Sequence, residues 1–152
     1  MKHLIQTKPQ CLLYSFAMAL DSTPEKLAKE IGHNGLEILW ADLERPDYFK
    51  GHHPVEFFIP ALRRGYAVMM FPINVVGGPD EKHQHIFLTR QYMQEYAKDL
   101  INQNRGVIVT DTHAMAFEKG MIYDPNRARY LLSQMSILRI QFVFTLHKIK
   151  SD

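Results

Sequence analysis

The residues in this chain with the clearest chemical potential are one thiol, one late imidazole and a carboxylate that follows it. Cys11 is the only cysteine among the 152 residues, and it directly precedes an apolar, helix-like run. His113 comes far downstream, and Asp124 follows it in the sequence Tyr-Asp-Pro-Asn. The thiolate is the attacking form of cysteine, and both a helix N-terminus and a neighbouring imidazolium stabilise it. These three residue types, in this order, indicate a nucleophilic thiol site.

The spacing of the imidazole and the carboxylate favours a β-hairpin between them. Lys119-Gly120 is a short hairpin-turn signal, so His113 and Asp124 are expected close together at the open end of the hairpin. In that position the carboxylate can hold the imidazole in its productive tautomer. Gln6, shortly before Cys11, can donate a side-chain N–H to the oxyanion of a tetrahedral intermediate. The backbone N–H of Cys11 would be the second oxyanion donor.

Two of these roles have alternative candidates. Asp111 lies two residues before His113, and such a pair within a strand points to one face, so Asp111 is the second choice for the orienting carboxylate. Gln10 or another donor could serve in place of Gln6 as the oxyanion donor.

The hydrophobic pattern places these residues on helices and strands. Residues 12–20 are apolar on nearly all sides, which predicts a helix through the core. Later segments alternate with turn signals and predict strands. Helices that precede an antiparallel sheet predict one α+β domain over residues 1–152. The expected helices are 12–20, 25–31, 54–64 and 91–102, and the expected strands are 66–73, 106–110, 113–118, 121–124 and 140–149.

Three of these elements carry more specific expectations. Thr23 is expected to cap the helix that begins near Pro24, and Gly32 is expected to end it. The helix 54–64 has an apolar stripe that is expected to face the core, and the strand 66–73 is expected to be buried. The stripe comprises Val55, Phe58, Ile59 and Leu62. Periodic Tyr92, Tyr96, Leu100 and Ile101 mark the helix 91–102.

Composition excludes several classes of function. The formal charge is +2, from 18 basic and 16 acidic residues, and no block of like charges occurs, so we expect no nucleic-acid partner. No apolar run approaches the ~20 residues that span a bilayer, so we expect no membrane insertion. The N-terminus has no secretory pattern, and a lone thiol suits a reducing compartment, so a cytoplasmic location is expected. A chain of this length and composition needs no cofactor, metal or disulfide to fold.

The same residues carry a family resemblance. Gln6 to Cys11, His113-Ala114-Met115-Ala116 and Tyr123-Asp124-Pro125 resemble the small papain-like cysteine peptidases related to the leader-peptide-processing domain of bacteriocin exporters. Stand-alone relatives of that kind are encoded by bacteria and their phages. The resemblance extends over most of the chain and implies a papain-like cysteine proteinase fold. It further implies that Cys11 is the nucleophile, His113 the general base, Asp124 the orienting residue and Gln6 the oxyanion donor.

The expected function is therefore a cysteine hydrolase, a peptidase or an amidase, acting on a peptide or protein substrate without a cofactor. The alternative is a catalytically inactive module with the same fold that binds a peptide or a host protein. Leu12 favours this alternative, because the family usually has glycine immediately after the nucleophile. A cell-wall amidase with the same chemistry is a third possibility.

Other polar residues have simpler interpretations. The pairs His83/His85 and His52/His53 could each contribute to a metal or substrate site, but no further ligands with suitable spacing accompany them, and solvated loops are expected. Trp40, with Asp42 and Glu44 nearby, could mark a partner surface, although a lone Trp is more often a partly buried anchor. The segment 75–84 contains Gly77, Gly78 and Pro79 and is expected to form a mobile flap.

Overall fold

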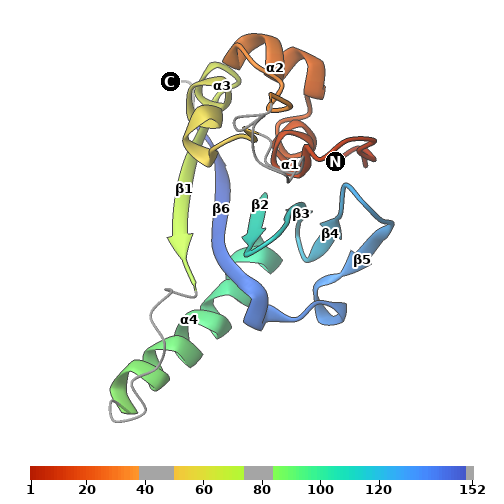
Figure 1. Cartoon of the computed structure of the whole chain (residues 1–152). Helices are drawn as coiled ribbons and strands as arrows, with labels where there is room; N and C mark the ends of the chain where they lie inside the picture. The colour runs from red at the N-terminus through yellow and green to blue at the C-terminus, as the bar shows by residue number, and fades with distance from the viewer. Residues whose placement is uncertain (38–49, 74–83, 150–152) are drawn as a thin grey trace.

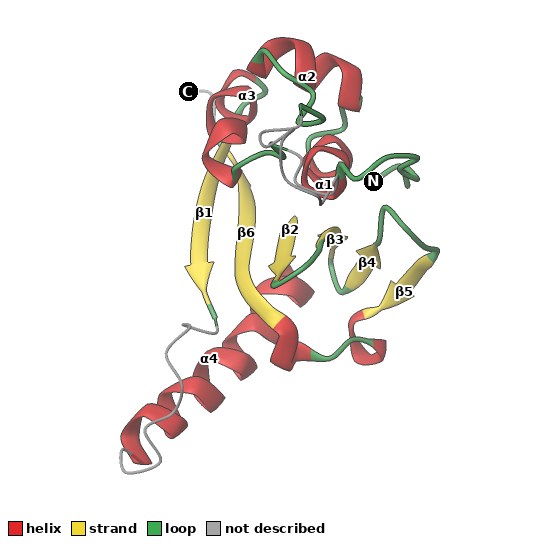
Figure 2. Cartoon of the chain, viewed as in Figure 1, coloured by secondary structure: helices red, strands yellow, loops and turns green. Residues whose placement is uncertain are grey.

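The protein is described here from a computed structural model, which places residues 1–37, 50–73 and 84–149, and all of their side chains except those of residues 84–91 and Leu138. Helices and strands follow one another as shown in Figures 1 and 2. The helices are α1 (Cys11–Ala19), α2 (Pro24–Ile31), α3 (Phe58–Arg63) and α4 (Gln84–Gln103), with short 3₁₀ turns at η1 (Pro54–Phe57), η2 (Leu132–Gln134) and η3 (Ile137–Arg139). The strands are β1 (Tyr66–Pro72), β2 (Arg105–Thr110), β3 (Ala114–Glu118), β4 (Met121–Tyr123), β5 (Arg129–Leu131) and β6 (Ile140–Lys148).

The strands form one six-stranded sheet in the order β1-β6-β2-β3-β4-β5. Every neighbouring pair is antiparallel. The N-terminal helices pack against this sheet, so the predicted α+β class is confirmed. In Figure 1, α1, α2 and α3 group together at the top, and α4 lies apart from them at the bottom.

Alternating side chains of the sheet supply two separate cores. Val107, Phe144 and Leu146 pack with α1, α2 and α3 in one buried cluster. Ile108 and Val143, each next in the chain to a residue of the first cluster, pack with Ala97 and Ile101 of α4 in a second buried cluster. Because successive strand residues point to opposite faces, the two clusters lie on the two faces of the sheet. A sheet covered on both faces is a rigid support for residues at the strand ends.

Helix α1 is the central element of the first core. Five consecutive residues, Ser15 to Ala19, are buried, as its all-round apolar sequence predicts. It packs mainly on β3 and β2, the strands nearest to His113. Gly106 of β2 allows a close approach to β6, since an added Cβ would lie 1.8 Å from the Phe144 carbonyl oxygen.

The cap of α2 matches its prediction. The Thr23 hydroxyl oxygen accepts a hydrogen bond from the Lys26 backbone N–H at 3.3 Å, and Pro24 occupies the first helical position. Gly32 ends the helix with φ of 102°, a conformation that glycine adopts without steric cost.

The predicted buried face of the helix 54–64 is wrong. Val55, Ile59 and Leu62 are all more than half exposed, whereas Phe57 and Ala61 are fully buried. The segment is a 3₁₀ turn followed by a short α-helix, and the change of helical type shifts the apolar stripe. Phe57 fixes the orientation by stacking on Phe16 of α1, with ring centroids 4.3 Å apart.

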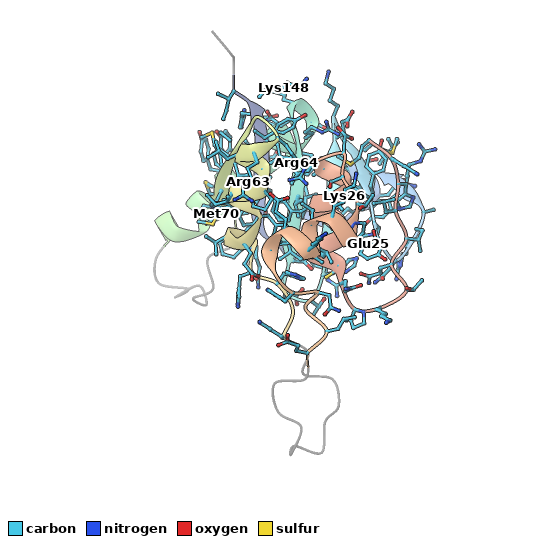
Figure 3. All side chains as sticks on the ribbon, turned by 90° about the horizontal axis from the view of Figure 1, so that it is seen from above. Glu25, Lys26, Arg63, Arg64, Met70 and Lys148 are labelled. Carbon is cyan, nitrogen blue, oxygen red and sulfur yellow. The ribbon has the colours of Figure 1, made fainter. Side chains whose placement is uncertain are left out.

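Ion pairs hold α3 to α2. Arg63 and Arg64, both labelled in Figure 3, reach the carboxylate of Glu30 at 3.0 and 2.8 Å. Their guanidinium groups lower the pKa of the Glu30 carboxyl below its ordinary value, the hydrogen bond from Arg64 being the largest effect.

The prediction of a buried strand at 66–73 is also wrong. Strand β1 lies at the sheet edge and pairs only with β6. Met69 and Met70 are about half exposed, at 49% and 53%, and Figure 3 shows Met70 at the margin of the molecule. The apolar sequence of residues 66–73 predicts a buried strand, but sequence alone does not indicate which strand lies at the edge of a sheet.

Two further elements differ from expectation. Helix α4 begins at Gln84, earlier than the predicted residue 91. Among its residues with described side chains, Ala97, Leu100 and Ile101 are buried, whereas Tyr92 is exposed. The short strand β5 was not predicted, because three residues carry too little alternation to be recognised.

Some sequence interpretations lie outside the described residues. They concern His83, Trp40, Asp42, Glu44 and the flap segment up to residue 83. Of the helices in the described ranges, none has both the length and the hydropathy needed to cross a bilayer.

Candidate functional site: a thiol, an imidazole and a carboxylate

Cys11 is the first residue of α1. The preceding residue, Gln10, caps the helix through its backbone, and its carbonyl oxygen accepts from the Tyr14 N–H at 3.0 Å. The Gln10 side chain itself accepts no hydrogen bond from the helix. The first N–H groups of a helix have no intrahelical partner and carry a partial positive charge. The thiol therefore lies where a helix stabilises negative charge, and its side chain is half-buried.

The N-terminal segment ties this helix start to the loop after β4. The Gln6 backbone N–H donates to the Pro125 carbonyl oxygen at 2.8 Å. The Nε2 atom of His3 lies 2.7 Å from the Asp124 carbonyl oxygen. These contacts place Cys11 beside a loop that is more than a hundred positions away in the sequence.

His113 and Asp124 flank the β3–β4 hairpin. The strands pair Ala116 with Tyr123, and the turn residues Lys119 and Gly120 have φ of 46° and 81°, as a tight hairpin requires. His113 immediately precedes β3 and Asp124 immediately follows β4. The His113 Nε2 atom lies 2.8 Å from Asp124 Oδ1, so the structure brings these two residues together as expected.

The turn before β3 is fixed by Thr110. Its hydroxyl oxygen accepts from the His113 backbone N–H at 3.0 Å, and the Thr110 N–H donates to the His113 carbonyl oxygen at 2.8 Å. His113 is therefore held by the hydrogen bonds of its backbone to Thr110 as well as by the hydrogen bond of its ring to Asp124.

The Cys11 thiol lies close enough to the His113 ring to raise the pKa of the imidazole through hydrogen bonding and charge. Because Nε2 of the ring is occupied by Asp124, Nδ1 is the nitrogen left for the thiol. The sulfur, the imidazole and the carboxylate thus form a continuous chain across three separate segments of the sequence.

This arrangement raises the pKa of His113 above its ordinary value of 6.5. Burial is the largest single effect and lowers the pKa, but the hydrogen bonds to Cys11 and Asp124, together with the negative charge of both groups, outweigh it. A raised pKa means that the folded protein holds the imidazolium proton more tightly than the unfolded chain. The corresponding stabilisation is complete below about pH 6.5 and is lost as the pH rises through the folded-state pKa.

Asp124 should be the carboxylate that sustains this shift. We expect the titration midpoint of His113 to fall in Asp124→Asn, because the negative charge is lost while the shape is kept. The exposed Asp111 is the matched control, and Asp111→Asn should leave the midpoint within about 0.2 pH units. Chemical shifts of the imidazole in NMR spectra between pH 4 and 9 measure both variants. A larger fall in Asp111→Asn than in Asp124→Asn would contradict the assignment.

Asp124 has further partners that the sequence did not suggest. The side chain is buried, and its Oδ1 also accepts from the Asn126 backbone N–H at 2.8 Å. The Tyr130 hydroxyl is within hydrogen-bonding reach of Asp124 and lies 2.9 Å from the Met115 sulfur. Burial, followed by the charge of Asp124, raises the pKa of Tyr130. The carboxylate is therefore held by the His113 ring and by the Asn126 N–H.

Gln6 lies between the helix start and the loop after β4. Its Oε1 atom accepts from the Gln10 backbone N–H at 3.3 Å, and its Nε2 atom donates to Asn126 Oδ1. An amide nitrogen carries two hydrogens, so one remains for an oxyanion near Cys11. The alternative donor, Gln10, instead directs its side-chain amide to the Asn34 carbonyl oxygen at 2.8 Å.

Asp111 does not take the orienting position. It is exposed in the bend between β2 and β3, and within the described residues it has no ion pair or hydrogen bond with His113. The expected strand relation between these residues fails because the chain turns at Thr110 rather than continuing as a strand.

The histidines near residue 52 form a structural cluster. His52 stacks on His33 at 4.4 Å, and His33 Nε2 lies 2.6 Å from Glu56. Burial lowers the pKa of His52. Within the described ranges, no group of three or more His, Cys, Asp or Glu side chains is arranged to hold a metal ion.

Sequence reasoning missed Tyr130, His3 and Thr110. Tyr130 lies on the unpredicted strand β5, and recognition of that strand would have placed it opposite Ile122, next to Asp124. His3 and Thr110 act on backbone groups, and no motif marks them.

Comparisons of the chain with protein-family models, with curated proteins and with solved structures found no match.

Proposed function

We propose that this protein is a papain-like cysteine hydrolase that cleaves a peptide or amide bond. One observation carries the proposal: the His113 ring is hydrogen-bonded to the buried carboxylate of Asp124, and it lies close enough to the Cys11 thiol at the start of α1 for the thiol to raise its pKa. Helices that precede an antiparallel sheet, with the thiol on the first helix and the imidazole at a strand end, support the papain-like arrangement.

The chemistry follows from the positions of the groups. Proton transfer from Cys11 to His113 Nδ1 gives a thiolate and an imidazolium, which the Asp124 carboxylate stabilises. The thiolate attacks the substrate carbonyl carbon, and the negative charge moves to the carbonyl oxygen. The Cys11 backbone N–H and the Gln6 side-chain amide are the available donors to this oxyanion.

The imidazolium then protonates the leaving nitrogen, the C–N bond breaks, and an amine departs. A thioester on Cys11 remains. Water attacks the thioester after giving its proton to His113, and the tetrahedral intermediate collapses to a carboxylic acid and the thiolate. No cofactor takes part in this sequence.

A burst assay tests the proposal without knowledge of the natural substrate. With excess p-nitrophenyl acetate we expect rapid release of about one p-nitrophenolate per chain, and mass spectrometry should find the acetyl group on Cys11. Cys11→Ala should show neither the rapid release nor the acetyl adduct. Release from the native protein no faster than from Cys11→Ala would overturn the proposal.

Gln6 should affect acyl transfer but not alkylation. We expect Gln6→Leu to slow the burst by about 10²-fold, as loss of one oxyanion donor does in related chemistry. Alkylation of Cys11 by iodoacetamide forms no oxyanion, so its rate should stay within about threefold. Equal slowing of both reactions would mean that Gln6 only supports the local structure, through its contacts with Gln10 and Asn126.

The second candidate is a binding module that keeps this architecture without hydrolysis. The engagement of the Gln6 amide by Asn126 favours it, because an oxyanion would have to share that donor group. The presence of Leu12 immediately after Cys11 points the same way. A stable acetyl-Cys11 adduct that forms but never turns over would support the module over the hydrolase.

A further inference from the structure

A cavity of about 380 Å³ lies beside the His113–Asp124 pair. Cys11 does not line it, and the cavity extends from the turn before β3 to β5 and η3. Eleven described residues form its wall: Thr110, Thr112, His113, Met115, Asp124, Asn126, Arg127, Tyr130, Met135, Ser136 and Arg139.

The wall carries an excess of positive charge. Arg127 and Arg139 both line the cavity, and within the described part of the chain neither guanidinium has an ion pair or a hydrogen bond. By contrast, Arg63, Arg64 and Arg105 are all paired with carboxylates. The charge of Arg127 acts to lower the pKa of Tyr130, which also lines the cavity.

The acidic residue in the wall does not compensate these charges. Asp124 is buried and already accepts from the Asn126 N–H and bonds to the His113 ring. Its charge is balanced by the imidazolium that it stabilises. Two cations thus remain for a ligand, and guanidinium groups bind carboxylates in a two-pronged geometry.

The other residues of the wall suit a ligand with a short aliphatic chain. Met115 and Met135 are apolar and adaptable, whereas Ser136 and Thr112 add hydroxyl groups. This combination matches an acidic amino-acid residue, with methylene groups against the methionines and a carboxylate at the arginines.

The position of the cavity relates it to one half of the substrate. The acyl half is bonded to Cys11 during the reaction, whereas the leaving amine takes its proton from His113. Because the cavity is lined by His113 and not by Cys11, it is the leaving half of the substrate that reaches it.

We propose that this cavity binds a carboxylate on the leaving half of the substrate, from an acidic side chain or a chain terminus. This inference rests on the proposed hydrolase function for the identity of the ligand. The binding of an anion at Arg127 and Arg139 can be measured without catalysis.

Binding is tested on Cys11→Ala, which cannot form an acyl-enzyme. The ligands are free glutarate, the dipeptides Ala-Glu, Ala-Gln and Ala-Lys, and the C-terminal amides of these dipeptides. Each ligand is titrated into the protein, and the NMR shifts of His113 and Tyr130 report on binding in the cavity. We expect Ala-Glu to bind at least about tenfold more tightly than the amide of Ala-Gln, which carries no carboxylate, with Arg127→Gln and Arg139→Gln each weakening the binding of Ala-Glu about tenfold. Arg129→Gln is the matched control, since Arg129 is exposed on neighbouring β5 and does not line the cavity.

The probes separate the sources of the carboxylate. If Ala-Gln binds and its amide does not, the carboxylate that the cavity binds is a chain terminus. If the amide of Ala-Glu still binds, the carboxylate is that of an acidic side chain. Glutarate that binds as tightly as Ala-Glu would overturn the assignment to a leaving peptide and leave a site for a free anion. Binding of Ala-Glu no tighter than that of the amide of Ala-Gln, which carries no carboxylate, or equal effects of Arg127→Gln and Arg129→Gln, would overturn the anion site itself. Failure of the burst assay, by contrast, concerns only the hydrolase proposal.

Discussion

Replacing His113 with alanine should slow the p-nitrophenyl acetate burst by about 10³-fold, because general acid–base catalysis by a positioned imidazole contributes about 10²–10⁴-fold. The ring bridges Cys11 and Asp124, so its loss removes both the proton acceptor of the thiol and the link to the carboxylate. Stopped-flow release of p-nitrophenolate at pH 7 measures the effect.

Alkylation by iodoacetamide separates thiol activation from proton delivery. An imidazole partner that takes up the thiol proton makes a cysteine more reactive towards alkylation. Allowing for the lower nucleophilicity of a stabilised thiolate, His113→Ala should slow alkylation at pH 6 by about 30-fold. The control His147→Ala, on β6 with its ring at Thr145, should alkylate like the native protein. Equal rates for His113→Ala and the native protein would show that His113 does not activate Cys11.

Replacing Asp124 with alanine should slow the burst by about 10³-fold, because the imidazole then loses the group that fixes its orientation. The Asn126 N–H and the Tyr130 hydroxyl lose a partner at the same time. Asp124→Asn keeps an oxygen acceptor and should recover the rate to within about tenfold of the native protein.

Thermal unfolding distinguishes an orienting role from a merely structural one. If alanine and asparagine lowered the burst rate equally while only alanine lowered the melting temperature, orientation by the Asp124 oxygen would be contradicted. The buried position of Asp124 makes this control necessary, since removal of a buried acceptor costs about 1–3 kcal/mol of stability.

The parts of the fold that follow from local signals were predictable. The cap at Thr23, the left-handed Gly32 and the Lys119-Gly120 turn each depend on a few neighbouring residues, and all three are as expected. The hairpin turn also fixed which residues meet at its open end. For that reason the His113–Asp124 pair could be derived before any coordinates were known.

Features that depend on the whole sheet were not predictable. Whether β1 is central or at an edge depends on the strand order, and whether Val55 or Phe57 faces the core depends on the stacking partner Phe16. The cavity residues Arg127 and Arg139 lie on separate turns around the unpredicted strand β5. No local pattern relates them.

The central claim is that Cys11 and His113 form one coupled pair, and an NMR titration of the His113 imidazole tests it most directly. The hydrogen bond to Cys11 and the charge of Cys11 both raise the pKa of His113. We therefore predict a lower titration midpoint in Cys11→Ala than in the native protein. The same midpoint in both proteins would mean that the thiol and the imidazole do not interact, and would contradict the account.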